Sequence, residues 1–318
     1  MALDPRKVYL DPQARTLLEM IALAKRIPYT DITPTQARAQ FVELCRRTRK
    51  PAEWPVTAED LTLSGPAGAL RARLFRATGE TGQALPTLLY FHGGGWSIGD
   101  IESYDPLCRQ LAAAAGCAVL SVDYRLAPEH PFPAAVEDCF AALGAILVEG
   151  DRLGLDIGRL AVGGDSAGGN LAAVTAIEAR DAGIALSAQV LLYPATDFAM
   201  DTRSHADYAE GFLLTRDAMN WFAGNYVGMA ERRDWRASPL LASDLAHLPP
   251  AIVIVGECDP LRDEGRAYAQ RLRAAGNEAD FQLYPGMIHG FAVMGGIIDA
   301  ADRAIAEIAT LLKRAFQR

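Results

Sequence analysis

Short, nearly continuous apolar runs recur along the middle of the chain, and they limit its fold more than any other feature. Each run is too short for a helix and too uniformly apolar for a strand that faces water on one side. Stretches with helical periodicity separate the runs. The pattern predicts a doubly wound α/β architecture, in which a mostly parallel sheet has helices on both faces. The runs are 87–91, 118–122, 160–163, 189–192 and 251–255, and the helical stretches are about 103–115, 133–149, 167–182, 263–275 and 297–317.

The segments before this alternation carry different signals. Residues 70–76 alternate apolar and basic side chains, which is typical of an edge strand facing water on one side. The first fifty residues predict two helices, because Asp11 and Thr33 are capping residues that are each followed by a proline. Proline is favoured at the first helical position. We expect both helices to pack on top of the sheet rather than within its layers.

Residues 198–236 interrupt the alternation of strands and helices. Large apolar side chains stand there amid charged ones, between two predicted strands. So many apolar groups in an insertion indicate a lid over a cleft, although ordinary packing against the domain also explains them and both can hold. The chain has no internal repeat and no linker between independent domains. The predicted division is a core of 51–197 and 237–318, with 1–50 and 198–236 added to it.

Composition and charge narrow the class of partner. The 318 residues are 50% hydrophobic and 22% charged, with a net charge of −8, which is the profile of a soluble globular protein without a nucleic-acid or anionic-membrane surface. No secretory signal or membrane-spanning run is visible, so we expect a cytoplasmic protein. The cysteines are odd in number and form no C-x-x-C pair, which predicts buried, reduced thiols rather than disulfides or a zinc site. They are Cys45, Cys108, Cys117, Cys139 and Cys258.

The sequence GDSAG at 164–168 directly follows a predicted strand and directly precedes a helical stretch. A strand, then G-x-S-x-G, then a helix is the context of a nucleophile elbow, in which a serine sits on a sharp, strained turn between tiny residues. The turn lifts the hydroxyl of Ser166 out of the sheet. The N–H group of Ala167 lies at a helix N-terminus, where negative charge is favoured. Ser166 is therefore the candidate nucleophile.

A second motif, HGGGW at 92–96, ends the strand at 87–91. Three glycines let the backbone approach a ligand closely and turn N–H groups toward one point. We expect the N–H groups of Gly94 and Gly95 to form an oxyanion hole with that of Ala167. His92 is expected to order the loop by hydrogen bonding. A phosphate cradle is the alternative, but neither G-x-x-x-x-G-K-[ST] nor G-x-G-x-x-G in a βαβ unit is present.

The candidate base and acid follow the last two predicted strands. His289 follows a short strand at 281–283, and Asp259 directly follows the strand at 251–255. Glu257 and Asp263 are rivals for the acid: Glu257 is nearer the strand end, and an N-cap at the start of a helix is a sufficient role for Asp263. The order Ser, Asp, His along the chain is that of α/β-hydrolases and differs from the orders in chymotrypsin and subtilisin.

With the motifs HGGGW, DYRLAPEHPFPA (123–134), GDSAGG, DPLRDEG and HGF in this order, the chain resembles the hormone-sensitive-lipase-like, bacterial family IV carboxylesterases of the α/β-hydrolase fold. The resemblance runs from about residue 86 to 291. It implies Ser166 as nucleophile, Asp259 as acid and His289 as base, with Gly94, Gly95 and Ala167 supplying the oxyanion N–H groups. It also implies a helical cap built from 1–50 and 198–236, and a plausible homodimer.

The expected reaction is hydrolysis of small, soluble esters with short to medium acyl chains through an acyl-enzyme, which needs no metal or organic cofactor. An amide, formamide or lactone hydrolase with the same triad remains an alternative. A ligand-binding receptor without turnover is another, which the presence of all three triad residues disfavours. The candidate substrate-binding residues are Trp96, Phe212, Leu213 and Leu214. Tyr124, Arg125 and Glu129 are expected to brace the site by buried polar contacts. His130, His205 and His247 are expected to be structural or surface residues.

Overall fold

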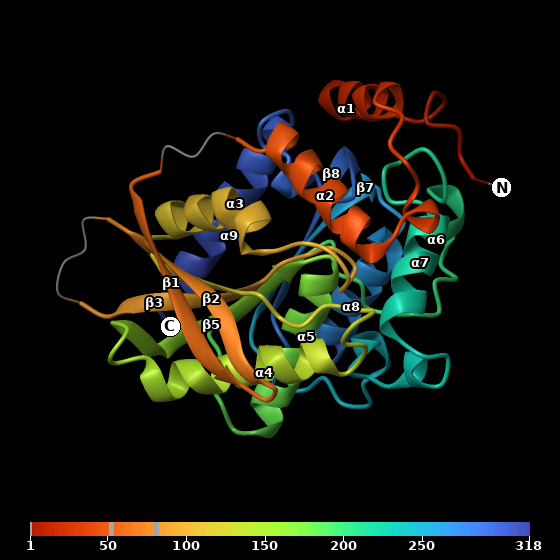
Figure 1. Ribbon diagram of the computed structural model, residues 1–318. Helices are drawn as coiled ribbons and strands as arrows, with labels where there is room; N and C mark the ends of the chain where they lie inside the picture. Colours follow the sequence, from red (N-terminus) through yellow and green to blue (C-terminus); the bar gives the residue numbers. More distant parts are fainter. Residues whose placement is uncertain (1, 51–53, 79–82) are drawn as a thin grey trace.

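The computed structural model describes residues 2–50, 54–78 and 83–318. In these ranges, eight strands form one sheet in the order β1-β2-β4-β3-β5-β6-β7-β8 (Figure 1). β2 pairs antiparallel with both β1 and β4, and all other neighbours are parallel. The strands are β1 (Val56–Gly65), β2 (Gly68–Ala77), β3 (Leu85–Phe91), β4 (Ala118–Val122), β5 (Leu155–Asp165), β6 (Ala188–Leu192), β7 (Ala251–Cys258) and β8 (Ala279–Ile288).

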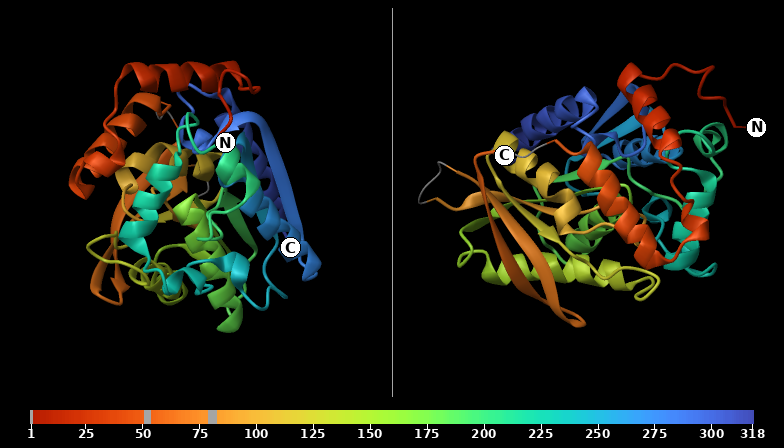
Figure 2. Two further views of the ribbon diagram at one scale, coloured as in Figure 1. Left: turned by 90° about the vertical axis from the view of Figure 1, so that its right-hand side faces the viewer. Right: turned by 45° about the horizontal axis from the view of Figure 1, so that its top comes forward.

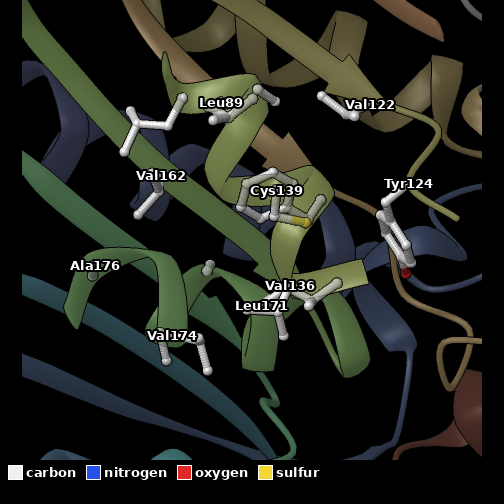
Figure 3. Close-up of a cluster of buried hydrophobic side chains, with 14 of the residues drawn as sticks. Leu89, Val122, Tyr124, Val136, Cys139, Val162, Leu171, Val174 and Ala176 are labelled. Carbon is white, nitrogen blue, oxygen red and sulfur yellow. The ribbon is translucent and has the colours of Figure 1, made fainter. Parts of the chain in front are cut away.

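Helices cover both faces of this sheet, as the sequence predicts. On one face, α3 (Ile101–Ala115) and α9 (Asp299–Ala315) share an apolar cluster with alternate residues of the strands. On the other face, α4 (Ala134–Glu149), α5 (Ala167–Asp181) and α8 (Arg262–Ala274) do the same. Figure 3 shows part of the second cluster, where Cys139 of α4 and Leu171 of α5 face Leu89 and Val162 of the sheet.

One strand prediction is wrong. Residues 70–76 belong to β2, which lies second in the sheet, and the edge strand is β1. β1 pairs with β2 along its whole length, from Val56 opposite Ala77 to Gly65 opposite Gly68. The alternation in β2 still reflects one solvent-facing side, because Arg73 pairs there with Asp60 of β1. The sequence does not indicate β1, because most side chains of this strand are polar or exposed.

Two additions to the core lie at one end of the sheet. α1 (Pro12–Leu23) and α2 (Pro34–Thr48) begin where predicted, with Asp11 and Thr33 capping their first turns. The insertion contributes α6 (Arg203–Asp207) and α7 (Arg216–Tyr226). Figures 1 and 2 show α2 and α7 at the same end of the core, and Tyr29 of η1 stacks on Trp221 of α7 with ring centroids 5.6 Å apart. The single-turn 3-10 helices are η1 (Tyr29–Asp31), η2 (Glu231–Arg233), η3 (Pro239–Leu241) and η4 (Phe291–Val293).

The five cysteines are buried free thiols, as predicted. Burial raises the pKa of Cys258, beside the candidate acid, to about 12. None of the helices within the described ranges is long and apolar enough to cross a membrane.

Candidate active site

Ser166 stands on the sharp turn between β5 and α5. Its φ of 56° and ψ of −117° lie in a region that side-chain-bearing residues rarely adopt, which is the strain expected of a nucleophile elbow. The neighbouring glycines make the turn possible. A Cβ atom on Gly168 would collide with the carbonyl oxygen of Phe91 at the end of β3, and one on Gly164 would collide with the backbone of Gly168.

Three side chains from separate parts of the chain meet at this turn. His289 Nε2 lies 2.9 Å from Ser166 Oγ, and His289 Nδ1 lies 2.8 Å from Asp259 Oδ2. Asp259 is fully buried, and its other carboxylate oxygen accepts a hydrogen bond from the N–H of Leu261 at 2.8 Å. The imidazole is therefore held between an oriented carboxylate and the serine hydroxyl. This is the relative placement that the sequence predicts for the three residues.

The two rivals for the acid have other partners. Glu257 Oε2 accepts from the N–H of Gly286, at 2.8 Å. Asp263 Oδ2 accepts from the N–H of Ser204, at 2.9 Å. The predicted N-cap role of Asp263 is wrong, because the cap position of α8 is Leu261 and Asp263 lies in the first helical turn. An acidic side chain in that turn still complements the helix dipole.

The glycine loop after β3 lies beside the serine. Gly94 and Gly95 have φ of 116° and 56°, and both line the same cavity as Ser166. In the part of the chain that the structure describes, the N–H groups of Gly94, Gly95 and Ala167 donate to no other group. His92 Nδ1 donates to the Gly93 carbonyl at 2.8 Å, which is the loop-ordering role predicted for it. Three backbone donors beside the serine hydroxyl remain available for an oxyanion.

Asp165 is a site residue that sequence reasoning missed. Its buried carboxylate accepts hydrogen bonds from Tyr90 Oη and Tyr104 Oη, each at 3.0 Å, and from the N–H of Gly93 at 2.8 Å. Burial raises the pKa of Asp165, while the tyrosine hydroxyls oppose that rise. The carboxylate thus ties the glycine loop to the residue that precedes the nucleophile. The only signal in the sequence is an acidic residue where a buried strand ends.

A cavity of about 150 Å³ opens onto Ser166 and His289. Most of its wall is apolar, with Trp96, Phe198 and Met219 among the contributors. Residues of the N-terminal segment, of the insertion and of the core all contribute to the wall. An apolar cavity that ends at a hydroxyl, an imidazole and free backbone donors is suited to holding an acyl group next to a nucleophile.

Residues 88–293 match the family described as the alpha/beta hydrolase fold. Carboxylic ester hydrolase LipN of Mycobacterium tuberculosis is 44% identical over 290 residues, which are 87% of this chain and 76% of LipN. Ethyl acetate hydrolase of Pseudomonas putida is 37% identical over 314 residues, which are 96% of this chain and 99% of that hydrolase. A solved structure is also similar, that of ester-hydrolase EH1AB1 from the metagenome of Lake Arreo, complexed with a derivative of bipyridine phosphonate. It matches with a TM-score of 0.94 and 41% identity, over 98% of this chain and 100% of EH1AB1.

The chain belongs to the hormone-sensitive-lipase-like carboxylesterases of the α/β-hydrolase fold. It is a carboxylic ester hydrolase of the serine hydrolase type. The fold, the family and the enzyme class predicted from the sequence are therefore confirmed.

Three of the four residues predicted to contact the substrate line the cavity of this esterase. They are Trp96, Leu213 and Leu214. Trp96 is fixed by a parallel stack on Tyr226 with ring centroids 4.5 Å apart. The fourth prediction is wrong: Phe212 is fully buried away from the cavity and packs edge-on against Tyr208 at 5.0 Å. Leu213 has a φ of 74°, so the chain turns sharply between two residues that sequence reasoning grouped together.

Tyr124 and Arg125 brace the esterase site through buried or half-buried polar contacts, as predicted, whereas Glu129 is exposed. Tyr124 Oη donates to the carbonyl of His92 at 2.7 Å. Arg125 pairs with the buried carboxylate of Asp138. Arg38 of α2 donates to Glu129 and to the carbonyl of Ser97, and so attaches the N-terminal segment to the loop that follows the glycines.

The three histidines predicted to be structural or surface residues differ in burial. His130 and His247 are exposed, whereas His205 of α6 is buried with its Nε2 3.1 Å from Glu264 Oε2. Among the described residues, His, Cys, Asp and Glu side chains nowhere gather in groups of three that could hold a metal ion.

Proposed function

We propose that the protein is a serine carboxylesterase that hydrolyses short- to medium-chain carboxylic esters through a Ser166–His289–Asp259 triad and an acyl-enzyme. The observation that carries the proposal is the hydrogen-bonded chain of the three side chains. Ser166 Oγ lies 2.9 Å from His289 Nε2, and His289 Nδ1 lies 2.8 Å from Asp259 Oδ2. A serine within reach of a base that a third group orients is the arrangement that activates a weak nucleophile.

In the first half of the reaction, Ser166 Oγ attacks the ester carbonyl carbon and its proton passes to His289 Nε2. Asp259 keeps the imidazole oriented through Nδ1 and stabilises the imidazolium that forms. The negative charge that develops on the carbonyl oxygen is met by the N–H groups of Gly94, Gly95 and Ala167. Each such donor lowers the barrier by about 3 kcal/mol in other oxyanion holes.

The second half releases the products. His289 gives its proton to the alkoxide, which leaves as an alcohol while Ser166 keeps the acyl group. A water molecule then loses a proton to His289 as it attacks the acyl carbonyl, and the carboxylic acid departs with the serine restored. An alkoxide leaves more readily than an amine, which favours esters over amides as substrates.

The size of the cavity supports the preference for acyl-chain length. About 150 Å³ is the volume of an apolar protein cavity that accepts a benzene molecule, hence about six carbons. A butanoyl or octanoyl chain has most of its apolar surface covered in such a space, whereas a palmitoyl chain extends beyond it. Burial of each additional CH₂ contributes about 0.8 kcal/mol only while the chain remains inside.

The experiment compares kcat/KM for p-nitrophenyl acetate, butyrate, octanoate and palmitate, with butyryl p-nitroanilide as the matched amide. We expect a maximum at butyrate or octanoate and no measurable amide turnover. A maximum at palmitate contradicts the proposed substrate class. Faster turnover of the anilide than of the ester assigns the site to amides, and a folded protein that turns over neither acts as a binding protein.

A further inference from the structure

Arg26 is a charged residue in the wall of an otherwise largely apolar cavity. It lies between α1 and η1 in the N-terminal segment, and it lines the same cavity as Ser166 and His289. Within the residues that the structure describes, no other arginine or lysine lines this cavity. The mechanism proposed above gives Arg26 no role.

Most of the hydrogen-bonding capacity of Arg26 is unused. A guanidinium carries five N–H donors, and here only Nη2 has a protein acceptor, the hydroxyl of Tyr29 at 3.1 Å. The Nε atom is buried and has no partner among the described residues. No carboxylate of the described chain lies within 4.0 Å of the guanidinium. A buried donor without an acceptor is costly, which indicates that an acceptor arrives with a ligand.

The guanidinium is held in place by aromatic side chains. Its central carbon lies 5.6 Å from the ring centroid of Tyr29, within the range of a cation–π contact. Tyr29 stacks on Trp221 at 5.6 Å and packs against Phe222 at 5.4 Å. The N-terminal segment and the insertion thus fix Arg26 together. An ordered cation loses less entropy when it binds an anion than a mobile surface arginine does.

The carboxylates around the cavity already have partners of their own. Asp165 accepts three hydrogen bonds beneath the glycine loop. Glu264 accepts from the N–H of Thr196 at 2.5 Å and lies 3.1 Å from His205 Nε2. Asp197 accepts from the N–H of Ala199 at 2.9 Å. Each of these carboxylates thus accepts at least one hydrogen bond, whereas Arg26 keeps a buried Nε donor without an acceptor. In apolar surroundings such a cation attracts an anion strongly.

We propose that Arg26 determines substrate specificity by binding a carboxylate that the ester carries away from its scissile bond. The substrate class is monoesters of short dicarboxylic acids, with the free carboxylate paired to the guanidinium while Ser166 attacks the ester carbonyl. Arginine suits this task because its N–H groups can bond both oxygens of a carboxylate at once. The inference rests on the proposed function, since it places this carboxylate relative to the Ser166 nucleophile.

The test measures how much the enzyme prefers a charged ester to a neutral one of the same shape. Methyl hydrogen glutarate is compared with methyl 4-carbamoylbutanoate, in which a carboxamide replaces the carboxylate, and the readout is the ratio of their kcat/KM values by pH-stat titration. A second pair, 4-acetoxybutanoate and its amide, places the carboxylate on the alcohol side. The variants are Arg26→Met, Arg26→Lys and the control Lys25→Gln, which removes an exposed cation one residue away.

We expect Arg26→Met to lower the ratio for the glutarate pair about tenfold or more, the effect of losing a charge-assisted hydrogen bond. Arg26→Lys should lower it less, and Lys25→Gln should leave it unchanged. A larger effect on the acetoxybutanoate pair places the carboxylate on the alcohol and overturns the proposed class. An unchanged ratio in Arg26→Met overturns the role of Arg26. An equal decrease in Lys25→Gln also overturns it, because long-range attraction then explains the preference.

A measurement on the unaltered enzyme needs no variant to fold. Glutarate should inhibit hydrolysis of p-nitrophenyl butyrate about tenfold more strongly than glutaramide does, and equal inhibition contradicts the inference. The two proposals can fail separately. If p-nitrophenyl butyrate is hydrolysed normally and glutarate has no advantage, only the role of Arg26 is lost. If no ester is hydrolysed, the proposed function itself fails.

Discussion

The backbone N–H of Gly93 donates to the carboxylate of Asp165 across 2.8 Å, and this bond joins the two loops that must act together in the esterase. Asp165 is adjacent to the nucleophile, and Gly93 is adjacent to the expected oxyanion donors. Tyr90 of β3 and Tyr104 of α3 hold the same carboxylate from the protein interior. The distance from the serine hydroxyl to the oxyanion donors is therefore controlled by a buried side chain that does not itself react.

The bond between Gly93 and Asp165 should affect the rate of hydrolysis. Asp165→Leu should lower kcat for p-nitrophenyl butyrate by about tenfold to a hundredfold, because leucine has no acceptor and leaves the Gly93 N–H unpaired in the interior, at about 1–3 kcal/mol. Tyr90→Phe is the matched control, since it removes one donor to Asp165 and leaves the bond to Gly93. Its kcat should fall less. A folded Asp165→Leu variant with unchanged kcat means that the carboxylate does not position the loop.

Replacing Leu213 or Phe212, which are adjacent in the insertion, should change different properties of the enzyme. Leu213 lines the cavity, so Leu213→Ala should enlarge it and shift the preferred acyl chain from butyrate toward octanoate. Phe212 is fully buried against Tyr208, so Phe212→Ala should lower the free energy of unfolding by about 3–5 kcal/mol and leave the chain-length preference unchanged. Chain-length profiles and denaturant unfolding of both variants check this. A shift of the preference in Phe212→Ala contradicts the placement of that ring.

Glu178 of α5 should make stability depend on pH. Burial raises its pKa from 4.5 to about 7, and Asp181 and Asp234 oppose its ionisation while Arg236 favours it. The folded state therefore binds a proton more tightly than the unfolded state does. The resulting stabilisation is complete below about pH 4.5 and is lost as the pH rises through about 7.

Replacement by glutamine removes this ionisation. Glu178→Gln should unfold at a temperature about 2 °C or more above that of the unaltered protein at pH 8, and at a similar temperature at pH 5. Thermal unfolding by circular dichroism at both pH values measures the difference. If the variant is less stable than the unaltered protein at pH 8, the attraction between ionised Glu178 and Arg236 outweighs the cost of burying the charge.

The parts of the site that sequence reasoning located are those that short motifs encode. Ser166 and its flanking glycines lie within five residues of one another. The predicted order of strand, turn and helix is therefore enough to place the serine on the turn, without tertiary information. His289 and Asp259 also follow strands whose carboxyl ends meet at one edge of the sheet. Parallel pairing then brings both residues to the serine, which is why three separate segments could be predicted to converge.

The features that sequence reasoning missed depend on where side chains point. Phe212 and Leu213 are equally apolar, and only the positive φ of Leu213 turns one into the core and the other into the cavity. The role of Asp165 depends on two tyrosines distant in the chain. β1 was not predicted because an edge strand with mostly exposed side chains lacks the apolar run that indicated the inner strands.

Covalent labelling by a fluorophosphonate, followed by intact-protein mass spectrometry, shows whether Ser166 is an activated nucleophile. Such a reagent reacts only with a serine that a neighbouring base activates beside an oxyanion hole. We expect one adduct per chain, located on Ser166, and none on the folded Ser166→Ala variant. An unlabelled wild type, or labelling that persists in Ser166→Ala, contradicts the assignment of Ser166 as the nucleophile.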